Sequence, residues 1–145
     1  MNERITEFID GQKVATICCL DEENKPYCFS CFFVLDKEKQ VIYFKSSATT
    51  HHGQILHQNP VVAGTIQPDK LNPLAIQGIQ FTGSILDVTD PLCSAAKSVY
   101  HKKYPFAMAM PGEVWTVQFQ YIKMTDNTLG FGKKITWHLN DLVEP

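Results

Sequence analysis

The sequence contains almost no arginine. Arg4 is the only one among the 13 basic residues of a 145-residue chain. Any site for an anion must therefore use lysine, histidine, hydroxyl or backbone N–H groups, without the bidentate guanidinium that suits phosphate. The formal net charge is −2, which gives no electrostatic basis for binding nucleic acid or an anionic membrane.

Long apolar runs, a secretion signal and metal-binding motifs are missing as well. No apolar run approaches the ~20 residues that cross a bilayer. The polar start, MNERITEFID, does not fit a signal peptide, and the five cysteines are an odd number. We therefore expect a cytoplasmic protein with free thiols. Cys28 and Cys31 have CxxC spacing but would point to opposite faces of a strand, so no metal site is expected.

The sequence does contain a series of short apolar segments separated by turn residues. At 44% hydrophobic and 19% charged residues, we expect one globular domain over residues 1–145. The fold class predicted is mainly β (α+β), a six- to seven-stranded antiparallel barrel with two to three peripheral helices. Strands are predicted at 13–20, 27–35, 41–45, 61–67, 74–88, 114–124 and 134–139, and helices at 4–10, from about 51, and at 91–104.

Two of these strands have unusual features. The strand at 27–35 is nearly all apolar, which predicts cover on both of its faces. The strand at 74–88 contains Gly78 and Gly83, and glycines inside a strand often mark bends or bulges.

Hydroxyl groups, a lysine and two histidines gather where the third predicted strand ends, in YFKSSATTHHGQILHQNP (43–60). Thr49 or Thr50 can cap a helix that begins near His51, whose N-terminus offers free N–H groups and a positive dipole end. With Lys45, these groups are the parts of a phosphate cradle. The segment lacks the spacing of a Walker loop, so an ordinary helix cap on a polar loop is the other interpretation.

The histidine pair, His51 and His52, also has two interpretations. Histidines at a helix start are commonly just solvated, whereas beside a phosphate either one would gain charge and its pKa would rise. Neighbouring helical side chains point about 100° apart, so this pair cannot easily share one metal ion.

The order of strand, hydroxyl cluster, basic pair, helix and Asn59–Pro60, followed by VVAGTI, resembles the pyridoxamine 5'-phosphate oxidase-like FMN-binding split barrels. The segments YHKKYPFA (100–107) and TDNTLGFGKKITW (125–137) resemble an uncharacterised bacterial branch of that family. The resemblance extends over nearly the whole chain. It implies a split β-barrel that forms a homodimer with FMN at the subunit interface. It also implies an oxidoreductase acting on a small molecule, with NAD(P)H as a candidate electron donor.

The resemblance further implies where FMN would bind. Backbone groups of the second strand would lie along the isoalloxazine edge, the end of the third strand would reach the ribityl chain and phosphate, and the next helix start would clamp the phosphate. The last strand, or residues 76–81 or 130–137 of the other subunit, would complete the pocket. The candidate cofactor-binding residues are Ser30, Cys31, Phe32, Phe33, Lys45, Ser46, Thr50, His51, His52, Lys133 and Trp137.

The last strand also has a purely structural interpretation. Asn127 and Gly130 are ordinary turn residues, Lys133 and Lys134 would point in alternate directions, and a tryptophan more often lies in a core or interface.

The chain departs from the family pattern in two respects. His51–His52 replace the usual Arg–Lys pair, which predicts an FMN dissociation constant that rises with pH between about 6 and 8. The family's C-terminal arginine motif for the substrate phosphate is missing, which argues against oxidation of pyridoxamine phosphate.

No side chain is identified as an acid or base catalyst. The alternatives are a non-enzymatic flavin- or haem-binding module, with His57, His101 or His138 as an axial ligand, and a split barrel that has lost its cofactor.

Overall fold

The computed structural model describes residues 1–130 and 132–143. Its α-helices are α1 (Glu3–Asp10), α2 (His51–Gln58) and α3 (Ala96–Lys103). Short 3₁₀ turns occur at Pro91–Cys93, Pro105–Ala109, Asn127–Leu129 and Leu139–Val143. The strands are β1 (Val14–Leu20), β2 (Pro26–Asp36), β3 (Val41–Ser46), β4 (Val61–Ile66), β5 (Gln77–Ile85), β6 (Glu113–Asp126) and β7 (Lys134–His138).

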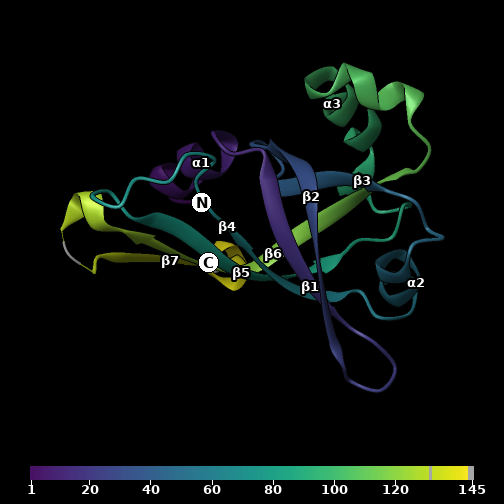
Figure 1. The fold of residues 1–145 in the computed structure, drawn as a ribbon, viewed down its shortest axis with the longest axis horizontal. Coiled ribbons are helices and arrows are strands. Elements are labelled where there is room, and N and C mark those ends of the chain that lie inside the picture. The colour runs from purple at the N-terminus through teal and green to yellow at the C-terminus, as the bar shows by residue number, and fades with distance from the viewer. Residues whose placement is uncertain (131, 144–145) are drawn as a thin grey trace.

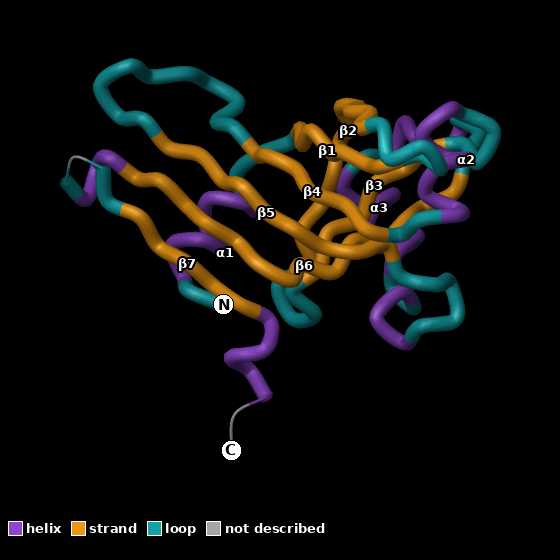
Figure 2. The backbone as a smooth tube through the Cα atoms, turned by 90° about the horizontal axis from the view of Figure 1, so that it is seen from below, coloured by secondary structure: helices purple, strands orange, loops and turns teal. Residues whose placement is uncertain are grey.

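The strands form one antiparallel sheet that closes on itself. Their order is β3-β2-β1-β4-β5-β6-β7, and an additional pairing of β3 with the first half of β6 closes a six-stranded barrel. The second half of β6 leaves the barrel and pairs with β7. Figures 1 and 2 show the resulting shape: α2 and α3 lie at the barrel end, and the β6–β7 turn lies at the opposite end of the molecule. The predicted fold class is confirmed.

Alternate residues of the strands fill the barrel. The main core includes Ile17, Phe33, Phe44, Phe119 and Ile122, and α1 packs its apolar stripe against it. A smaller cluster outside the barrel joins α3 to β3 through three tyrosines, Tyr43, Tyr100 and Tyr104. These packed clusters hold α3 in place at one side of the barrel.

The glycines of β5 behave differently from each other. The register between β5 and β6 shifts between Thr82 and Gly83, as expected for a bulge. A Cβ on Gly83 would lie 2.5 Å from the Gln118 carbonyl oxygen, so the close approach of the two strands requires glycine there. No register shift occurs at Gly78.

Three predictions about the elements are corrected by the structure. The strand predicted at 74–88 is shorter, because the side chains of Asn72 and Asp87 bond backbone N–H groups in turns at its two ends. The helix predicted at 91–104 divides into a 3₁₀ turn, which Asp90 caps, and α3. The predicted cover of 27–35 on both faces holds only for Phe33–Leu35, since the outward residues before them are exposed.

The five cysteines are free thiols, as predicted. No helix in the described part of the chain is long and apolar enough to cross a membrane. The same residues contain no group of three or more side chains suited to holding a metal ion.

Candidate functional site

One edge of β2 is unpaired along most of the strand. β3 pairs with β2 only from Phe33 to Asp36. Along its other edge, β2 pairs with β1. The Phe33 N–H donates to the Lys13 carbonyl and the Asp21 N–H donates to the Lys25 carbonyl, so the odd-numbered residues of β2 direct their backbone groups toward β1. The backbone groups of Ser30 and the other even-numbered residues therefore point to the open edge. Pro26 lies at such a position, where its missing N–H costs no ladder bond.

A cavity of about 250 Å³ lies along this open edge. β2 forms the floor of the cavity. The last residues of β3 and His52 of α2 form its polar end, and α3 with the segment after it forms the opposite wall. The lining residues are Phe29, Ser30, Cys31, Phe32, Lys45, Ser46, His52, Tyr100, Phe106, Ala107, Met110 and Pro111. Six of the eleven residues predicted from the sequence are thus brought together, from three separate elements.

The polar end of the cavity is formed by Ser46 and His52. The Ser46 hydroxyl lies 2.6 Å from His52 Nε2, and the imidazole stacks on the Phe29 ring at 3.8 Å between centroids. Burial, and to a lesser extent the neighbouring His51, hold the pKa of His52 below its ordinary value. His52 is therefore neutral at pH 7 in the absence of an anion, and it shares one hydrogen bond with the Ser46 hydroxyl. A phosphate at this position would have to raise that pKa before His52 could act as a cation.

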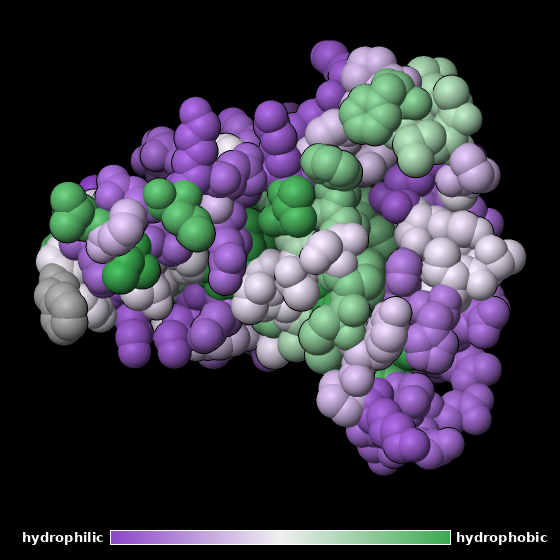
Figure 3. Space-filling view, in the orientation of Figure 1, coloured by the Kyte–Doolittle hydropathy of each residue, from purple (hydrophilic) through white to green (hydrophobic). Residues whose placement is uncertain are grey.

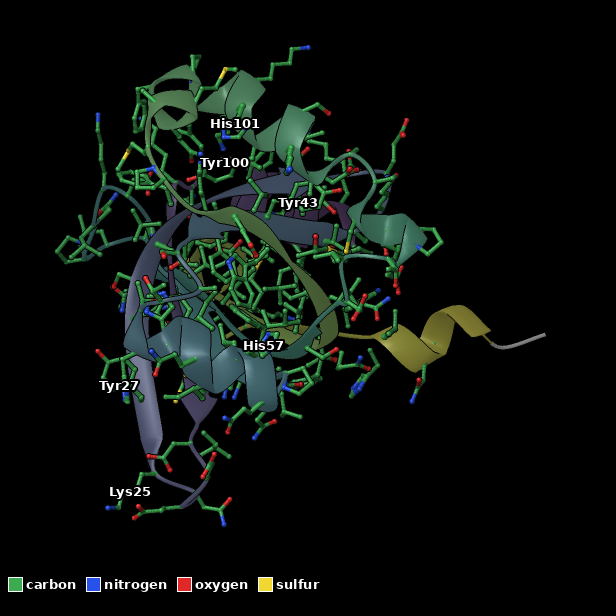
Figure 4. All side chains as sticks on the ribbon, turned by 90° about the vertical axis from the view of Figure 1, so that its right-hand side faces the viewer. Lys25, Tyr27, Tyr43, His57, Tyr100 and His101 are labelled. Atoms are coloured by element: carbon green, nitrogen blue, oxygen red, sulfur yellow. The ribbon has the colours of Figure 1, made fainter. Side chains whose placement is uncertain are left out.

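Lys45 supplies the charge of the cavity but already has two partners. Its ammonium donates to the Ala107 carbonyl at 2.6 Å and lies 3.0 Å from His101 Nε2. An ammonium group can only donate, so His101 is the acceptor in that contact. Lys45 thus connects β3 to α3 and to the cavity wall after it; Figure 4 shows Tyr100 and His101 on α3, over β3.

The part of the cavity formed by β2 is mainly apolar. The Phe32 side chain is 48% exposed, whereas Phe33, the next residue, is fully buried in the core. Phe33 can therefore offer only its backbone, and its carbonyl already accepts from Tyr104 at 2.7 Å. Burial raises the pKa of the Cys31 thiol to about 12, so this thiol is an apolar wall group and not a nucleophile.

The N-terminus of α2 is capped as predicted, but only one of its two histidines faces the cavity. Thr50 is the N-cap, accepting from the Gly53 N–H at 3.0 Å and donating to the Ser47 carbonyl at 2.8 Å. His51 turns away and meets the Tyr27 ring edge-on at 4.6 Å. It lines a separate hollow of about 590 Å³ with Asp21, Glu22 and Glu23, whose charges disfavour an anion. The structure therefore separates the two histidines, and only His52 lines the cavity.

The last strand and its turn lie far from this cavity within one protomer (Figure 1). Lys133 is exposed on the β6–β7 turn, and Trp137 is 7% exposed in the main core. The turn is held by Asp126, which accepts from the Thr128 N–H, and by Asn127, which accepts from the Gly132 N–H. Phe131, within the predicted segment 130–137, lies outside the described residues. In the single protomer, the described residues of TDNTLGFGKK thus form a hydrogen-bonded turn.

The sequence did not reveal the far wall of the cavity. Tyr100, Phe106, Ala107 and Met110 belong to a stretch that reads as a helix followed by a loop. One signal was available in the sequence, the large apolar residues Phe106, Met108 and Met110 in a short connection, and the structure leaves all three exposed. Such a connection usually covers or borders a site.

None of the three histidines considered as haem ligands lines the cavity. His57 is exposed on α2, His138 is exposed on β7, and His101 contacts Lys45. Figure 4 shows His57 and His101 on opposite sides of the barrel end.

Solved structures with the same fold include proteins that bind different cofactors. A heme binding protein from Mycobacterium smegmatis superposes with a TM-score of 0.75 at 18% identity, over 90% of this chain and 55% of that protein, so this chain spans about half its length. A Clostridium acetobutylicum protein of the pyridoxinephosphate oxidase family gives 0.67 at 12% identity, over 96% and 94% of the two chains. An FAD-binding protein from Mesorhizobium loti gives 0.65 at 10% identity, over 86% and 94%. At these identities the likeness establishes the split-barrel fold alone.

Sequence relatives are much nearer. No protein-family model matches the chain. A UPF0306 protein of Photorhabdus laumondii is 35% identical over 133 residues, which are 92% of either chain. The UPF0306 protein YhbP of Escherichia coli O7:K1 is 32% identical over 140 residues, 97% of this chain and 95% of YhbP. By identity and coverage over nearly its whole length, this chain belongs to the UPF0306 family.

Proposed function

We propose that this chain is an FMN-binding flavoprotein, acting as an oxidoreductase on a small molecule, with its cofactor in the cavity along β2. The observation that carries the proposal is the open backbone edge of β2, with an exposed aromatic side chain beside it and a polar, cationic end. An isoalloxazine ring has a flat apolar face and a polar edge, and the ribityl phosphate is an anion. The cavity offers a matching group for each part.

The residues present fit FMN part by part. Phe32 and the partly buried Cys31 thiol provide apolar contact for the ring, and the backbone of Ser30 offers hydrogen bonds to its polar edge. Ser46, His52 and Lys45 stand at the end where the phosphate would lie. When bound, FMN supplies hydride or electron transfer, while these residues bind and orient it and exclude water.

The size of the cavity supports a dimeric site. A hollow of about 250 Å³ lies below the usual ~300–1,000 Å³ range for small-molecule pockets. In a single protomer it can hold only part of a flavin nucleotide. A second copy of the chain would supply the missing wall, as proposed for residues 76–81 and for the β6–β7 turn with Lys133.

The outer face of four neighbouring strands is suited to that contact. Direct cross-strand pairing places its residues on one surface, and none of them is charged. Depletion of charge marks the centre of protein interfaces. Figure 3 shows this surface as a white and green band over β1 and β2. The residues of this uncharged face are Val14, Thr16, Cys18, Leu20, Cys28, Ser30, Phe32, Val61, Ala63, Thr65, Gln80, Thr82 and Ser84.

Titration of the purified protein with FMN, followed by quenching of flavin fluorescence, tests the proposal. We expect saturable quenching, and bleaching of the bound flavin by NAD(P)H under anaerobic conditions if the protein is an oxidoreductase. Absence of saturable quenching contradicts the proposal. A Soret band after addition of haem, without flavin binding, supports the haem-binding alternative instead, with His52 as the histidine that lines the cavity.

A matched pair of variants tests the role of the β2 edge. Ser30→Pro removes the backbone N–H at the open edge, whereas Ser30→Ala removes only the hydroxyl. We expect Ser30→Pro to weaken FMN binding about tenfold, the cost of one hydrogen bond of ~1.4 kcal/mol, and Ser30→Ala to change it less than about twofold. Circular dichroism checks that both variants fold. Equal effects of the two would contradict binding through the backbone.

Oxidation of pyridoxamine phosphate is not part of this proposal. Arg4 lies on α1 and its guanidinium is 3.7 Å from the buried Asp126 carboxylate. The Arg4 guanidinium therefore contacts the start of the β6–β7 turn and lines none of the described cavities.

A further inference from the structure

Three buried tyrosines join α3 to the barrel, and one of them has no acceptor for its hydroxyl group. Tyr43, Tyr100 and Tyr104 are 0%, 4% and 6% exposed and belong to the same packed cluster. Tyr43 donates to the Asp36 carboxylate at 2.9 Å, and Tyr104 donates to the Phe33 carbonyl at 2.7 Å, whereas the described residues provide no acceptor for Tyr100. Buried polar groups are nearly always hydrogen-bonded, so the third hydroxyl differs from its two neighbours.

The Tyr100 hydroxyl has access to the cavity along β2. Tyr100 lines this cavity, and the other two tyrosines do not. Among the described residues, the buried side-chain polar atoms that have neither a partner nor contact with free space are Thr116 Oγ1 and Trp137 Nε1. The Tyr100 oxygen is not one of these sealed atoms, so it faces the free space of the cavity. A molecule in the cavity would therefore supply the missing acceptor.

Tyr100 is a hydrogen-bond donor at neutral pH. Burial, and to a lesser extent the nearby Cys31 thiol, raise the pKa of Tyr100 above its ordinary value, and the approach of the Lys45 backbone N–H offsets this rise only in part. The phenol therefore keeps its proton. A backbone N–H can only donate, so Lys45 cannot take that proton. Tyr100 thus offers one O–H group to an acceptor atom of a ligand.

The surroundings of Tyr100 limit what kind of acceptor fits. Among the described residues that line the cavity there is no carboxylate, and the one ammonium, on Lys45, already donates to the Ala107 carbonyl and to His101. In the proposed function, the phosphate of FMN takes the remaining N–H of that ammonium. A second anion at Tyr100 would lose its hydration without gaining a cation of its own. The hydroxyl is therefore suited to an uncharged acceptor, such as a ring carbonyl oxygen or a ring nitrogen.

We propose that Tyr100 contacts the cofactor, and that its hydroxyl donates a hydrogen bond to an uncharged acceptor atom of the isoalloxazine ring. The inference rests on the proposed FMN binding and adds a contact from the wall opposite β2. The open edge of β2 and Tyr100 of α3 then hold the ring from two sides. The acceptor atoms of a flavin ring become more electron-rich on reduction, and a hydrogen bond to a more negative acceptor is stronger. Tyr100 therefore stabilises the reduced cofactor more than the oxidised one.

Tyr100→Phe and Tyr104→Phe are a matched pair, because each removes one buried phenol hydroxyl from the same cluster. We expect Tyr100→Phe to weaken FMN binding about tenfold, as for the loss of one hydrogen bond, without lowering the urea midpoint of unfolding. Tyr104→Phe should lower that midpoint, because it leaves the Phe33 carbonyl without its donor, and should change FMN binding less than about twofold. Flavin fluorescence titration and urea unfolding measure the two quantities. Unchanged FMN affinity in Tyr100→Phe, or equal losses of affinity and stability in the two variants, would overturn the inference.

Riboflavin locates the contact, since it has the ring of FMN and lacks the phosphate. We expect Tyr100→Phe to weaken the binding of riboflavin and of FMN by the same factor, whereas Lys45→Met should weaken mainly that of FMN. An effect of Tyr100→Phe confined to FMN would place the contact at the phosphate and overturn the assignment to the ring.

The midpoint potential of the bound flavin gives a readout that a purely structural role would not move. Tyr100→Phe should lower the two-electron potential by ~30 mV for each tenfold loss of preference for the reduced form, and Tyr104→Phe should leave it unchanged. An unchanged potential in Tyr100→Phe would contradict the donor role. The failure of this inference is separable from that of the proposed function: an unmodified protein that binds no FMN removes both, whereas FMN binding that is indifferent to Tyr100→Phe removes only the inference.

Discussion

Two turns of this molecule contain similar types of polar residue but have different surroundings. The β3–α2 turn and the β6–β7 turn both combine lysine with hydroxyl or amide side chains, and both satisfy many of their own polar groups. The first borders an open strand edge and a cavity, whereas the second closes a hairpin outside the barrel. Residue type alone therefore does not identify a ligand site. What distinguishes the two turns is the unpaired backbone and the hollow next to the first one.

The comparison depends most strongly on dimer formation, because only a second copy can bring the β6–β7 turn to a flavin cavity. Ala63→Lys places a charge in the middle of the uncharged face. Like charges at an interface cost several kcal/mol, so we expect dissociation of the dimer and at least about hundredfold weaker FMN binding. Analytical ultracentrifugation and flavin titration measure the two effects. Val88→Lys, at an exposed position on the β5–α3 connection, is the control. An unmodified protein that sediments as a monomer would refute the dimeric site.

The second prediction concerns the stability of the β6–β7 turn. Asp126 is 1% exposed and accepts hydrogen bonds from Thr128, so Asp126→Ala should lower the free energy of unfolding by about 2 to 3 kcal/mol. Asp87 makes the same pair of bonds with Thr89 in an exposed turn, and Asp87→Ala is the matched control, with a smaller loss. Urea unfolding measures both. Equal losses would show that burial of the turn contributes nothing.

Acid should destabilise the same turn. Burial alone would raise the pKa of Asp126, but the hydrogen bonds of Thr128 and Gln77 and the charge of Arg4 outweigh it, so the pKa lies below its ordinary value. A carboxyl with a depressed pKa stabilises the fold above its unfolded pKa of ~3.9, and that contribution is lost as the pH falls through the folded value. Asp126→Ala should therefore lose less stability than the unmodified protein between pH 5 and about 3, as followed by thermal unfolding.

The two lysines give the most direct comparison of the turns. Lys45→Met removes the cation at the flavin cavity, and we expect the FMN dissociation constant to rise about tenfold, as for a charge-assisted hydrogen bond. Lys133→Met removes an exposed charge that would act from the second copy, and we expect about a two- to threefold rise, typical of an exposed pair. Fluorescence titration compares them. A larger effect for Lys133 would reverse the assignment of the two turns.

The smallest expected effect is the pH dependence contributed by His52. Its pKa is low without an anion, and a bound phosphate would raise it, so binding takes up a proton. The FMN dissociation constant should therefore rise with pH, by at most about tenfold per unit, as the pH climbs from below 6.5 toward the pKa of the bound state. His52→Gln should flatten this dependence, and His51→Gln should not. A flat profile in the unmodified protein would mean that neutral donors and Lys45 hold the phosphate.

The sequence predicted the barrel, the positions of most of its strands and half of the cavity, because apolar periodicity and turn residues act locally. Thr50 was predicted as the helix cap for the same reason. The separation of His51 from His52 was not predictable, since it depends on Phe29 and Tyr27 of β2, which approach α2 only in the folded chain. The far wall from Tyr100 to Met110 was also missed, because its position depends on tertiary packing against Tyr43.

The exposed outward face of β2 is a second feature that the sequence did not predict correctly. An apolar strand predicts burial, and here the chain on its own does not provide it. In the dimer that we propose, a second copy of the chain would cover this face.

The length of β6 determines how far the β6–β7 hairpin can reach from the barrel. This one strand of 14 residues begins just after the cavity wall at Pro111 and ends at the β6–β7 turn. At about 3.3 Å per residue, β6 has a contour length of roughly 45 Å between the cavity wall and the tip of the hairpin. Inserting one residue would turn every later side chain of β6 to the opposite face, whereas inserting two would keep the faces and move the tip about 7 Å outward. Natural variation in the reach of this hairpin should therefore come in steps of two.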